Sequence, residues 1–446
     1  MAETRYRWYR ELNGYHWFVL IVAALGWLFD CLDQQLFILA RQPAMAELLP
    51  GTPTQAQIDQ AGAYSTAIFL MGWAIGGLVF GVMGDRVGRA RTMIVTILMY
   101  SLFTGLSALS VSFWDFALYR FLTGLGVGGE FAVGVALVAE VMPDRARPYC
   151  LSVLQALSAI GNISAAAIGM TMGTLAERGL VESVWRPMFV VGAVPALLAL
   201  VIRWRLREPE RWQKASHEGE VARKLGSYRE LFGHPVWRKH ALVGLGLAFS
   251  GIVGLWGVGF FTFDLVGNVL RTRFVAEGMS EPQVAGAVAH WKGIASMMMN
   301  VGGAVGMYSF AILAQRAGRK VTFAICFVAA LLSTASVFYY LREFHQVFWM
   351  VPIMGFCILS LFAGYAIYFP ELFPTHLRST GTSFCYNVGR FVAAAGPALL
   401  GWLTGVVYAD TAEPLRNAGL TMCGIFALGL LVLPFAPETK DQPLPE

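Results

Sequence analysis

Apolar residues in this chain run in long blocks that are separated by short polar segments rich in proline and glycine. Many of the blocks approach the ~20 residues that an α-helix needs to cross a ~30 Å hydrocarbon core. The pattern therefore predicts an all-α membrane protein. Its twelve expected transmembrane helices lie at about 17–39, 62–83, 92–111, 116–141, 149–174, 185–203, 241–265, 291–313, 321–340, 346–369, 380–405 and 416–436.

The polar connections divide the chain into two halves. Residues 204–240 form the one long polar connection, and they fall near the midpoint of the chain. We expect residues 1–203 to form an N-terminal six-helix bundle, 204–240 a cytoplasmic linker and 241–446 a C-terminal six-helix bundle. The seventh block is the least regular, because four glycines within 251–259 lower its helix propensity.

Composition agrees with this pattern. Of the 446 residues, 57% are hydrophobic and 14% are charged, against about 25% charged in an average soluble domain. Most of the 33 lysines and arginines fall in alternate connections, starting with the N-terminal segment. The positive-inside rule then places both termini in the cytoplasm. We expect a multi-pass protein of the plasma membrane, which in a bacterium is the inner membrane. Its predicted surroundings are the lipid bilayer, and no nucleic-acid partner is expected.

Two short motifs occur once in each half. The pattern E-x-x-P-x-x-x-R spans Glu140–Arg147 and again Glu371–Arg378, 231 residues later. The loop G-D-R-V-G-R at Gly84–Arg89 has a counterpart, A-Q-R-A-G-R, at Ala314–Arg319, 230 residues later. Two signatures at nearly one offset indicate a duplicated six-helix unit.

These motifs also carry a family resemblance. Gly81–Arg91 (GVMGDRVGRAR), Arg120–Glu130 (RFLTGLGVGGE) and Arg207–Trp212 (REPERW) resemble the major facilitator superfamily. Pro370–Gly381 (PELFPTHLRSTG) and Asn387–Arg390 (NVGR) resemble its organic-ion, aromatic-acid and metabolite symporters, and several motifs are shared with sugar porters. The resemblance implies two pseudo-symmetric bundles that alternate access to a central cavity.

The loop motifs are predicted to form a gate. Asp85 can accept hydrogen bonds from the N-terminus of a facing helix, and the arginines can bridge to carboxylates such as Glu140. The resemblance implies an inner latch that is closed when the transporter faces outward. The alternative is a positive-inside turn with no role beyond topology. The predicted gating residues are Gly84, Asp85, Arg86, Gly88, Arg89, Glu140, Arg147, Glu371 and Arg378.

A carboxylate and an arginine are predicted to lie at matching depth. Asp33 in the first block and Arg120 in the fourth both fall about 6 Å below the outer surface, at 1.5 Å per residue. Sugar porters, which the chain resembles, use an acid and an arginine on these two helices for proton coupling. We expect Asp33 to carry the proton and Arg120 to be its partner, whereas the alternative is a static buried ion pair. The repeat offset matches Asp33 with Asp264.

Two further acids stand inside predicted membrane helices, where a charge is costly. Asp30 lies one turn from Asp33 on the same face and is included with the proton-coupling residues. It is predicted either to line the cavity, to tune the proton affinity of Asp33 by like-charge repulsion, or to stay protonated. Glu130 ends the glycine-rich run of the fourth block. It is predicted either as a second proton site or as a partner for a neighbouring hydroxyl or amide.

Arg390 is the residue that bears most on the substrate. It falls about 15 Å into the eleventh block, near the midplane, and its guanidinium stays charged. Either a protein carboxylate, Asp264 or Glu130, neutralises it or an anionic substrate does. Transporters that the chain resembles carry an arginine in this context, implicated in holding anions.

Other polar residues of the spans are predicted to share the substrate cavity or, alternatively, to make interhelical hydrogen bonds. They are Gln34, Gln155, Asn162, Asn300, Tyr365 and Asn387.

The motifs that would indicate an enzyme or a pump are missing. The sequence has no P-loop, catalytic dyad or metal-ligand spacing, and its six cysteines lie in or beside apolar blocks. We therefore expect no cofactor and no catalytic activity. The resulting prediction is a monomeric, proton-coupled symporter of a small organic anion, a mono- or aromatic carboxylate. Alternatives are a symporter of a sugar, polyol or other neutral metabolite, and a transport-inactive receptor or scaffold on the same fold.

Overall fold

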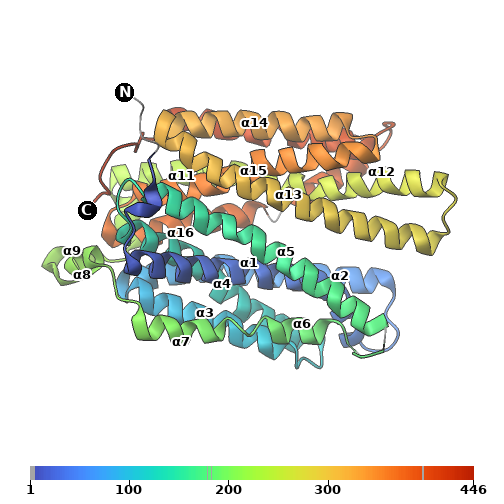
Figure 1. The fold of residues 1–446 in the computed structure, drawn as a ribbon, viewed down its shortest axis with the longest axis horizontal. Helices are drawn as coiled ribbons and strands as arrows, with labels where there is room; N and C mark the ends of the chain where they lie inside the picture. Colours follow the sequence, from blue (N-terminus) through green and yellow to red (C-terminus); the bar gives the residue numbers. More distant parts are fainter. Residues whose placement is uncertain (1–5, 178, 182, 394–395) are drawn as a thin grey trace. The chain divides into compact units, whose positions relative to one another are not determined.

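The computed structural model describes residues 6–177, 179–181, 183–393 and 396–446. Every regular element in these residues is helical (Figure 1). The α-helices are α1 (Gly14–Leu48), α2 (Gln55–Arg86), α3 (Arg89–Ser107), α4 (Phe113–Val141), α5 (Arg147–Glu177), α6 (Trp185–Val191), α7 (Ala196–Arg205), α8 (Glu210–His217), α9 (Gly219–Lys224), α10 (Tyr228–Gly233), α11 (Pro235–Val253), α12 (Thr262–Ala276), α13 (Glu281–Ala317), α14 (Arg319–Tyr340), α15 (Phe344–Leu372), α16 (Arg378–Ala393), α17 (Gly396–Trp402), α18 (Pro414–Met422) and α19 (Ile425–Val432). Short 3-10 or π turns are η1 (Trp8–Arg10), η2 (Gly254–Val258), η3 (Gly259–Phe261), η4 (Thr375–Leu377), η5 (Leu403–Val407) and η6 (Leu433–Phe435).

The helices coincide with the predicted blocks. Within the described residues, 10 helical segments are long and apolar enough to cross a membrane. The sixth block is divided into α6 and α7 around Pro195, and the eleventh contains α16 and α17. The all-α prediction with its twelve blocks is therefore confirmed.

Several helices begin with the same local device. Asn13, Thr54, Ser112 and Ser280 each form a capping box with the residue three positions later. The box satisfies backbone N–H groups that have no partner inside the helix. These residues explain where α1, α2, α4 and α13 start.

The seventh block departs from regular α-helix, as its glycines predict. After α11 the chain passes through the π turn Gly254–Val258 and the 3-10 turn Gly259–Phe261 before α12 begins. Glycine restrains the backbone least, so the hydrogen-bond register changes here.

The duplication is visible in how helices pack. Gly72 and Gly76 of α2 face α4 so closely that an added Cβ would lie 2.2 and 2.0 Å from carbonyl oxygens of α4. Gly302 and Gly306 of α13 meet α15 in the same way, each at 2.1 Å. Both pairs are 230 residues apart, so each half repeats the same close helix contact through small residues.

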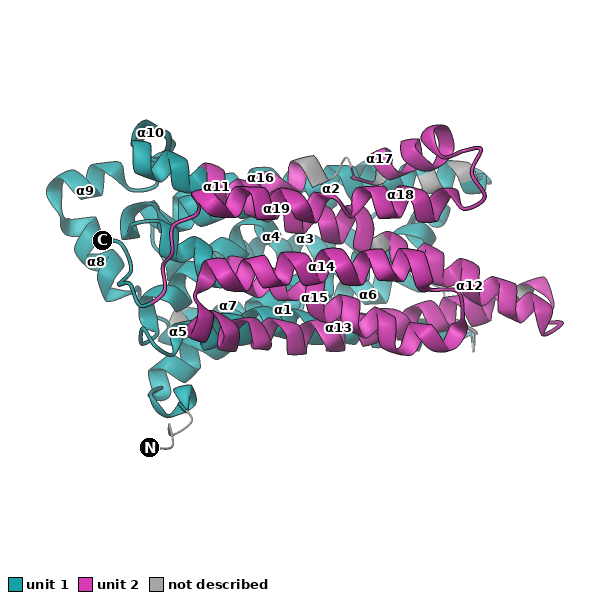
Figure 2. Cartoon of the chain, turned by 90° about the horizontal axis from the view of Figure 1, so that it is seen from above, with its two compact units in different colours: residues 1–241, 366–387, 441–446 teal, residues 242–365, 388–440 magenta. Residues whose placement is uncertain are grey.

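The chain forms two compact units (Figure 2). Unit 1 comprises residues 1–241, 366–387 and 441–446, and unit 2 comprises 242–365 and 388–440. Unit 1 thus combines the first half of the sequence with the end of α15, η4, the beginning of α16 and the last six residues. In unit 1, α1 begins and the chain ends on the side where α8 and α9 lie (Figure 1).

Candidate functional sites

The predicted pair of Asp33 and Arg120 is present in unit 1. Arg120 Nη2 lies 2.9 Å from Asp33 Oδ2, and neither side chain is exposed. Thr104 of α3 donates a hydrogen bond of 2.6 Å to Asp33 Oδ1. The carboxylate of Asp33 is therefore carried by α1, and α3 and α4 each direct one polar group at it.

Aromatic rings surround the guanidinium of Arg120. Its central carbon lies 4.6 Å from the ring centre of Phe37, 4.9 Å from that of Phe69 and 5.2 Å from that of Phe189. Cations interact favourably with such rings. The rings also exclude water, so Arg120 depends on Asp33 for its counter-charge.

Glu130 of α4 faces α1 directly. A Cβ added to Gly26 would lie 1.8 Å from Glu130 Oε1, so only glycine leaves room for the carboxylate. Glu130 is 1% exposed, and its two oxygens accept no hydrogen bond from the described residues. The predicted structural partner, a hydroxyl or amide, is therefore not found there. Asp30, one turn beyond Gly26, is equally buried.

Asp264, the repeat mate of Asp33, has a different environment in unit 2. Its side chain is 54% exposed and pairs with Lys292 of α13 at 3.2 Å. The equivalence in sequence position does not extend to an equivalent buried ion pair.

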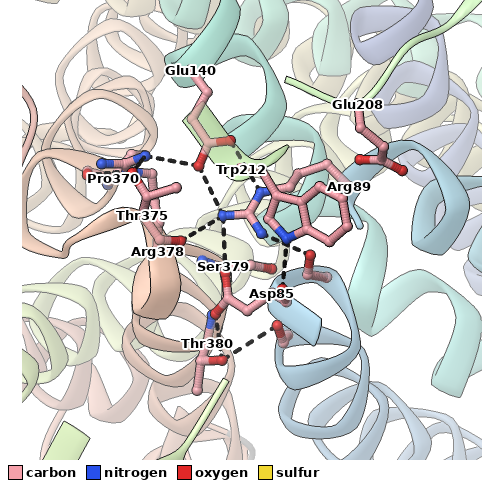
Figure 3. A network of polar contacts seen from close by, with 12 residues as sticks. Asp85, Arg89, Glu140, Glu208, Trp212, Pro370, Thr375, Arg378, Ser379 and Thr380 are labelled. Atoms are coloured by element: carbon pink, nitrogen blue, oxygen red, sulfur yellow. Dashed lines mark hydrogen bonds and ion pairs between the residues drawn. The ribbon is translucent and has the colours of Figure 1, made fainter. Parts of the chain in front are cut away.

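Asp85 binds the N-terminus of α16 (Figure 3). Its carboxylate accepts hydrogen bonds from the backbone N–H groups of Ser379 and Thr380, at 3.1 and 2.8 Å, and from Thr380 Oγ1 at 2.6 Å. The first N–H groups of a helix have no partner within it and favour negative charge. The contact predicted for Asp85 is therefore formed, inside unit 1.

A charged chain continues from Asp85. Arg89 Nη2 lies 3.1 Å from Asp85 and 2.8 Å from Glu140, and Arg378 Nη1 lies 2.7 Å from the same Glu140 oxygen. Arg89 also donates to the carbonyl of Thr375 at 2.7 Å. All four charged side chains are unexposed. We call Asp85, Arg89, Glu140, Arg378 and the first turn of α16 the latch.

Arg147 and Arg378 occupy matching positions in the two copies. Arg147 Nε donates to the carbonyl of Ala139 at 2.8 Å, and Arg378 Nε donates to that of Pro370 at 3.1 Å. Each arginine thus ties its own E-x-x-P-x-x-x-R turn to the preceding helix. Asp144 pairs with Arg147, and Glu371 lies close enough to interact with it electrostatically.

The start of α3 is built around Gly88. Gly88 has φ +121°, and Glu208 accepts hydrogen bonds from the backbone N–H groups of Ala90 and Arg91 at 3.2 and 3.1 Å. Among the other predicted gating residues, Arg86 donates to the carbonyl of Leu225 at 3.0 Å. Gly84 lies against Ser379 Oγ, 2.5 Å from where its Cβ would be.

Unit 2 repeats this device at the start of α14. Gly318 has φ +90°, and Glu438 accepts from the backbone N–H groups of Arg319 and Lys320 at 2.9 and 3.1 Å. Burial by itself raises the pKa of Glu438, but hydrogen bonds from four backbone N–H groups hold it below its ordinary value.

The two acids Glu208 and Glu438 were missed in the sequence analysis. The signal for them was present, because both follow the last predicted span of their half at the repeat offset, beside a proline. Trp212, whose indole N–H donates to the carbonyl of Asp85 at 2.6 Å, ends the Arg207–Trp212 motif, which served for the family resemblance and was not connected with the gate.

Comparison with known proteins agrees with this geometry. The family profile described as Major Facilitator Superfamily matches residues 23–291. The chain belongs to this family.

Two relatives illustrate its place. A "Probable 4-methylmuconolactone transporter" of Cupriavidus pinatubonensis is 30% identical over 93% of this chain and 89% of its own length. The "Cis,cis-muconate transport protein" of Acinetobacter baylyi is 26% identical over 93% and 94%. Among solved structures, the proton:xylose symporter XylE shares the fold, with a TM-score of 0.77 and 17% identity over 96% of this chain and 98% of that one.

The family assignment establishes the general activity. This chain is a multi-pass membrane transporter of small metabolites and not an enzyme. Its fold is that of the superfamily, as predicted.

The predicted substrate residues of this transporter are divided between the two units. Gln34, Gln155, Asn162 and Asn387 belong to unit 1, and Asn300, Tyr365 and Arg390 belong to unit 2. Their role stays a prediction. Gln155 is 3% exposed and its Oε1 accepts no hydrogen bond from the described residues.

Three of these residues make hydrogen bonds within their own unit. Asn387 Nδ2 donates to the carbonyl of Gly128 at 3.3 Å. Tyr365 donates to the carbonyl of Leu247 at 2.7 Å, and Asn300 Nδ2 donates to that of Ser296 at 2.9 Å. The hydroxyl proton of Tyr365 is thereby already used.

An aromatic cluster in unit 1 was not predicted. Phe131 stacks on Tyr386 with ring centres 4.0 Å apart, and Trp27 lies 4.6 Å from Phe131. The cluster joins α1, α4 and α16 beside Glu130. Tyr386 precedes Arg390 by one helical turn on α16.

A cavity of about 750 Å³ in unit 2 lies elsewhere. It is an open pocket lined by residues of α12, the α14–α15 connection and the start of α18, and none of the predicted site residues lines it. Its arginines already have partners; Arg342, for example, makes two bonds of 2.7 and 2.9 Å to Glu413.

Proposed function

We propose that this transporter is a proton-coupled symporter of a small organic anion, a mono- or aromatic carboxylate, that works by alternating access. The observation that carries the proton part is the fully buried pair of Asp33 and Arg120. A buried acid that can be neutralised by a proton, next to a cation that cannot, is a switch with two charge states.

The switch acts through the cost of a buried charge. With Asp33 ionised, the pair is neutral and α1, α3 and α4 are held together. A proton on Asp33 leaves Arg120 among aromatic rings without a counter-charge, a state that costs about 3–5 kcal/mol. Rearrangement of the helices relieves this cost, which couples protonation to the change of conformation. Asp30 and Glu130, buried on the same helix pair, extend the set of groups that can hold the proton.

Arg390 is proposed as the anion-binding residue. It is 8% exposed and follows Arg378 on α16 by twelve residues, about 18 Å along the helix. Its planar guanidinium suits a carboxylate. The names of the relatives support this class of substrate: one is a cis,cis-muconate transport protein, and another, 26% identical, is a benzoate transport protein of Acinetobacter baylyi. The cluster of Trp27, Phe131 and Tyr386 offers flat apolar surfaces suited to an unsaturated ring.

The latch is proposed as the inner gate, with both termini and residues 204–240 on the cytoplasmic side. Its closed state in this structure supports that role, because its ion pairs and hydrogen bonds join the end of α2, the start of α3 and the end of α4 to the start of α16. Opening the gate then requires these buried groups to separate together. A monomer contains every group used in this scheme.

The test begins with thermal stability of the purified protein in the presence of organic acids, sugars and amines. Hits are then assayed for uptake driven by a pH gradient in liposomes. We expect stabilisation by carboxylates and accumulation that needs an inward proton gradient. Stabilisation by neutral sugars alone contradicts the anion proposal, and the absence of proton-linked flux across the panel favours a transport-inactive receptor.

A further inference from the structure

The last six residues of the chain cross from one unit to the other. Residues 388–440 belong to unit 2, whereas 441–446 belong to unit 1. Leu444 is 3% exposed, although residues 441–443 before it are exposed. The side chain of Leu444 therefore anchors a tail whose preceding residues are exposed.

The residue after this anchor contacts the latch. The carbonyl oxygen of Pro445 accepts a hydrogen bond of 2.8 Å from Arg378 Nη2. The other nitrogens of this unexposed guanidinium bind Glu140, Thr375 and Pro370. The tail thus supplies a hydrogen-bond acceptor to the third nitrogen of the arginine that closes the latch.

The tail is also held at its beginning. Glu438 caps α14, and Lys440 Nζ donates to the carbonyl of Arg316 at 3.1 Å. The residues that precede the tail in the chain are therefore fixed within unit 2.

We propose that residues 441–446 are a clamp that stabilises the closed latch. A buried, charged N–H group that loses its acceptor is unfavourable, so Arg378 leaves the latch more readily when the tail is displaced. The clamp acts on one copy of the repeat, because the described hydrogen bonds of Arg147 go to Ala139 and Asp144 in its own turn. The proposal concerns the latch alone and does not depend on the class of substrate.

Amide hydrogen exchange of the 446-residue chain in lipid nanodiscs tests the clamp. The amides of Ser379 and Thr380 donate to Asp85, so their exchange reports opening of the latch. In Leu444→Asp, and in a variant lacking 441–446, we expect exchange at these amides to be about tenfold faster, the effect of losing one buried hydrogen bond to a charged donor. Gln442→Ala, at an exposed position of the same tail, is the matched control and leaves exchange unchanged.

The amides of Arg319 and Lys320, which donate to Glu438, show whether the effect is local. Faster exchange at Ser379 and Thr380 with unchanged exchange at these two amides supports the clamp. Unchanged exchange at Ser379 and Thr380, or an equal increase at all four amides, overturns it.

Discussion

At the scale of single residues, Asp33 and Asp264 show how far one sequence position determines chemistry. The repeat places them at equivalent positions, yet Asp33 is unexposed beside Arg120 and Asp264 is half exposed beside Lys292. The difference comes from the facing helix, which supplies a buried arginine in one unit and a partly exposed lysine in the other. Buried acids depend on their partner far more than exposed ones.

Replacement of Asp33 by Asn is therefore expected to remove proton coupling. Asn keeps the size and can accept from Thr104, but it cannot change charge. We expect accumulation against a gradient to be lost, whereas exchange of labelled for unlabelled substrate across liposomes is retained. Asp264→Asn is the matched control and keeps accumulation. Accumulation that survives in Asp33→Asn means that another group carries the proton.

Gly26 shows that a residue without a side chain can position a functional one. Its missing Cβ leaves the space that Glu130 occupies against α1. On α1, Asp30 follows Gly26 by one turn and Asp33 follows Asp30 by another. Together with Glu130 of α4, which lies against Gly26, these two acids form a row along the contact of α1 with α4. This places Asp30 between Glu130 and the switch, which the pattern of α1 alone did not indicate.

At the scale of helices, α3 and α14 begin in the same way. A glycine with positive φ precedes each helix, and an acid from far along the chain binds its first N–H groups. The acid lies over the positive end of the helix dipole. The duplicated motif thus extends beyond the loop that revealed it.

Glu438→Gln is expected to lower stability in a pH-dependent way. The lowered pKa of Glu438 means that its stabilisation is complete above the ordinary value of 4.5 and is lost as pH falls through the folded-state pKa. We expect the variant to melt a few degrees lower at neutral pH, as for loss of about 0.5–1 kcal/mol at a helix N-terminus. The gap should narrow as the pH falls below 4.5 and Glu438 becomes protonated.

Melting curves of wild type and variant across this pH range check the prediction. Glu446→Gln, at an exposed position, serves as the control with no expected gap. A gap of equal size at every pH would assign the effect to packing and not to charge.

At the scale of the whole molecule, the linker is part of the fold of unit 1. Residues 204–240 were predicted as a polar connection, and they form α8, α9 and α10 against the latch. Trp212 donates to the carbonyl of Asp85, and the backbone N–H of Gly226 donates to the carbonyl of His376 at 2.9 Å. The linker therefore contacts both segments that the latch joins.

Gly226→Ala is expected to loosen the linker. Gly226 has φ +60°, and an added Cβ would lie 2.7 Å from the carbonyl oxygen of Val82. A side chain held in this conformation costs about 1–3 kcal/mol. We expect trypsin to cleave several-fold faster after Arg223 and Lys224. Gly219→Ala is the matched control, because nothing lies within 4 Å of its added Cβ; equal cleavage in both variants contradicts the prediction.

Much of this protein follows from the sequence by itself. Block length and hydropathy are local properties, so they determined the helical class, the positions of the spans and the irregular seventh span. The repeated loops identified the duplication. Depth along two helices, together with the resemblance to sugar porters, predicted the pair of Asp33 and Arg120. A helix N-terminus could be predicted as a partner of Asp85, because an acid inside a basic loop is not needed for topology and can accept hydrogen bonds from such an end.

The tertiary structure decided which polar groups meet. The caps by Glu208 and Glu438, the different partners of Asp33 and Asp264, the space at Gly26 and the contact of Pro445 with Arg378 all join segments far apart in sequence. Helix formation is governed by neighbours along the chain, whereas the partner of a buried charge is selected by the packing of several helices at once. Only that packing fixes the free energy of the charge.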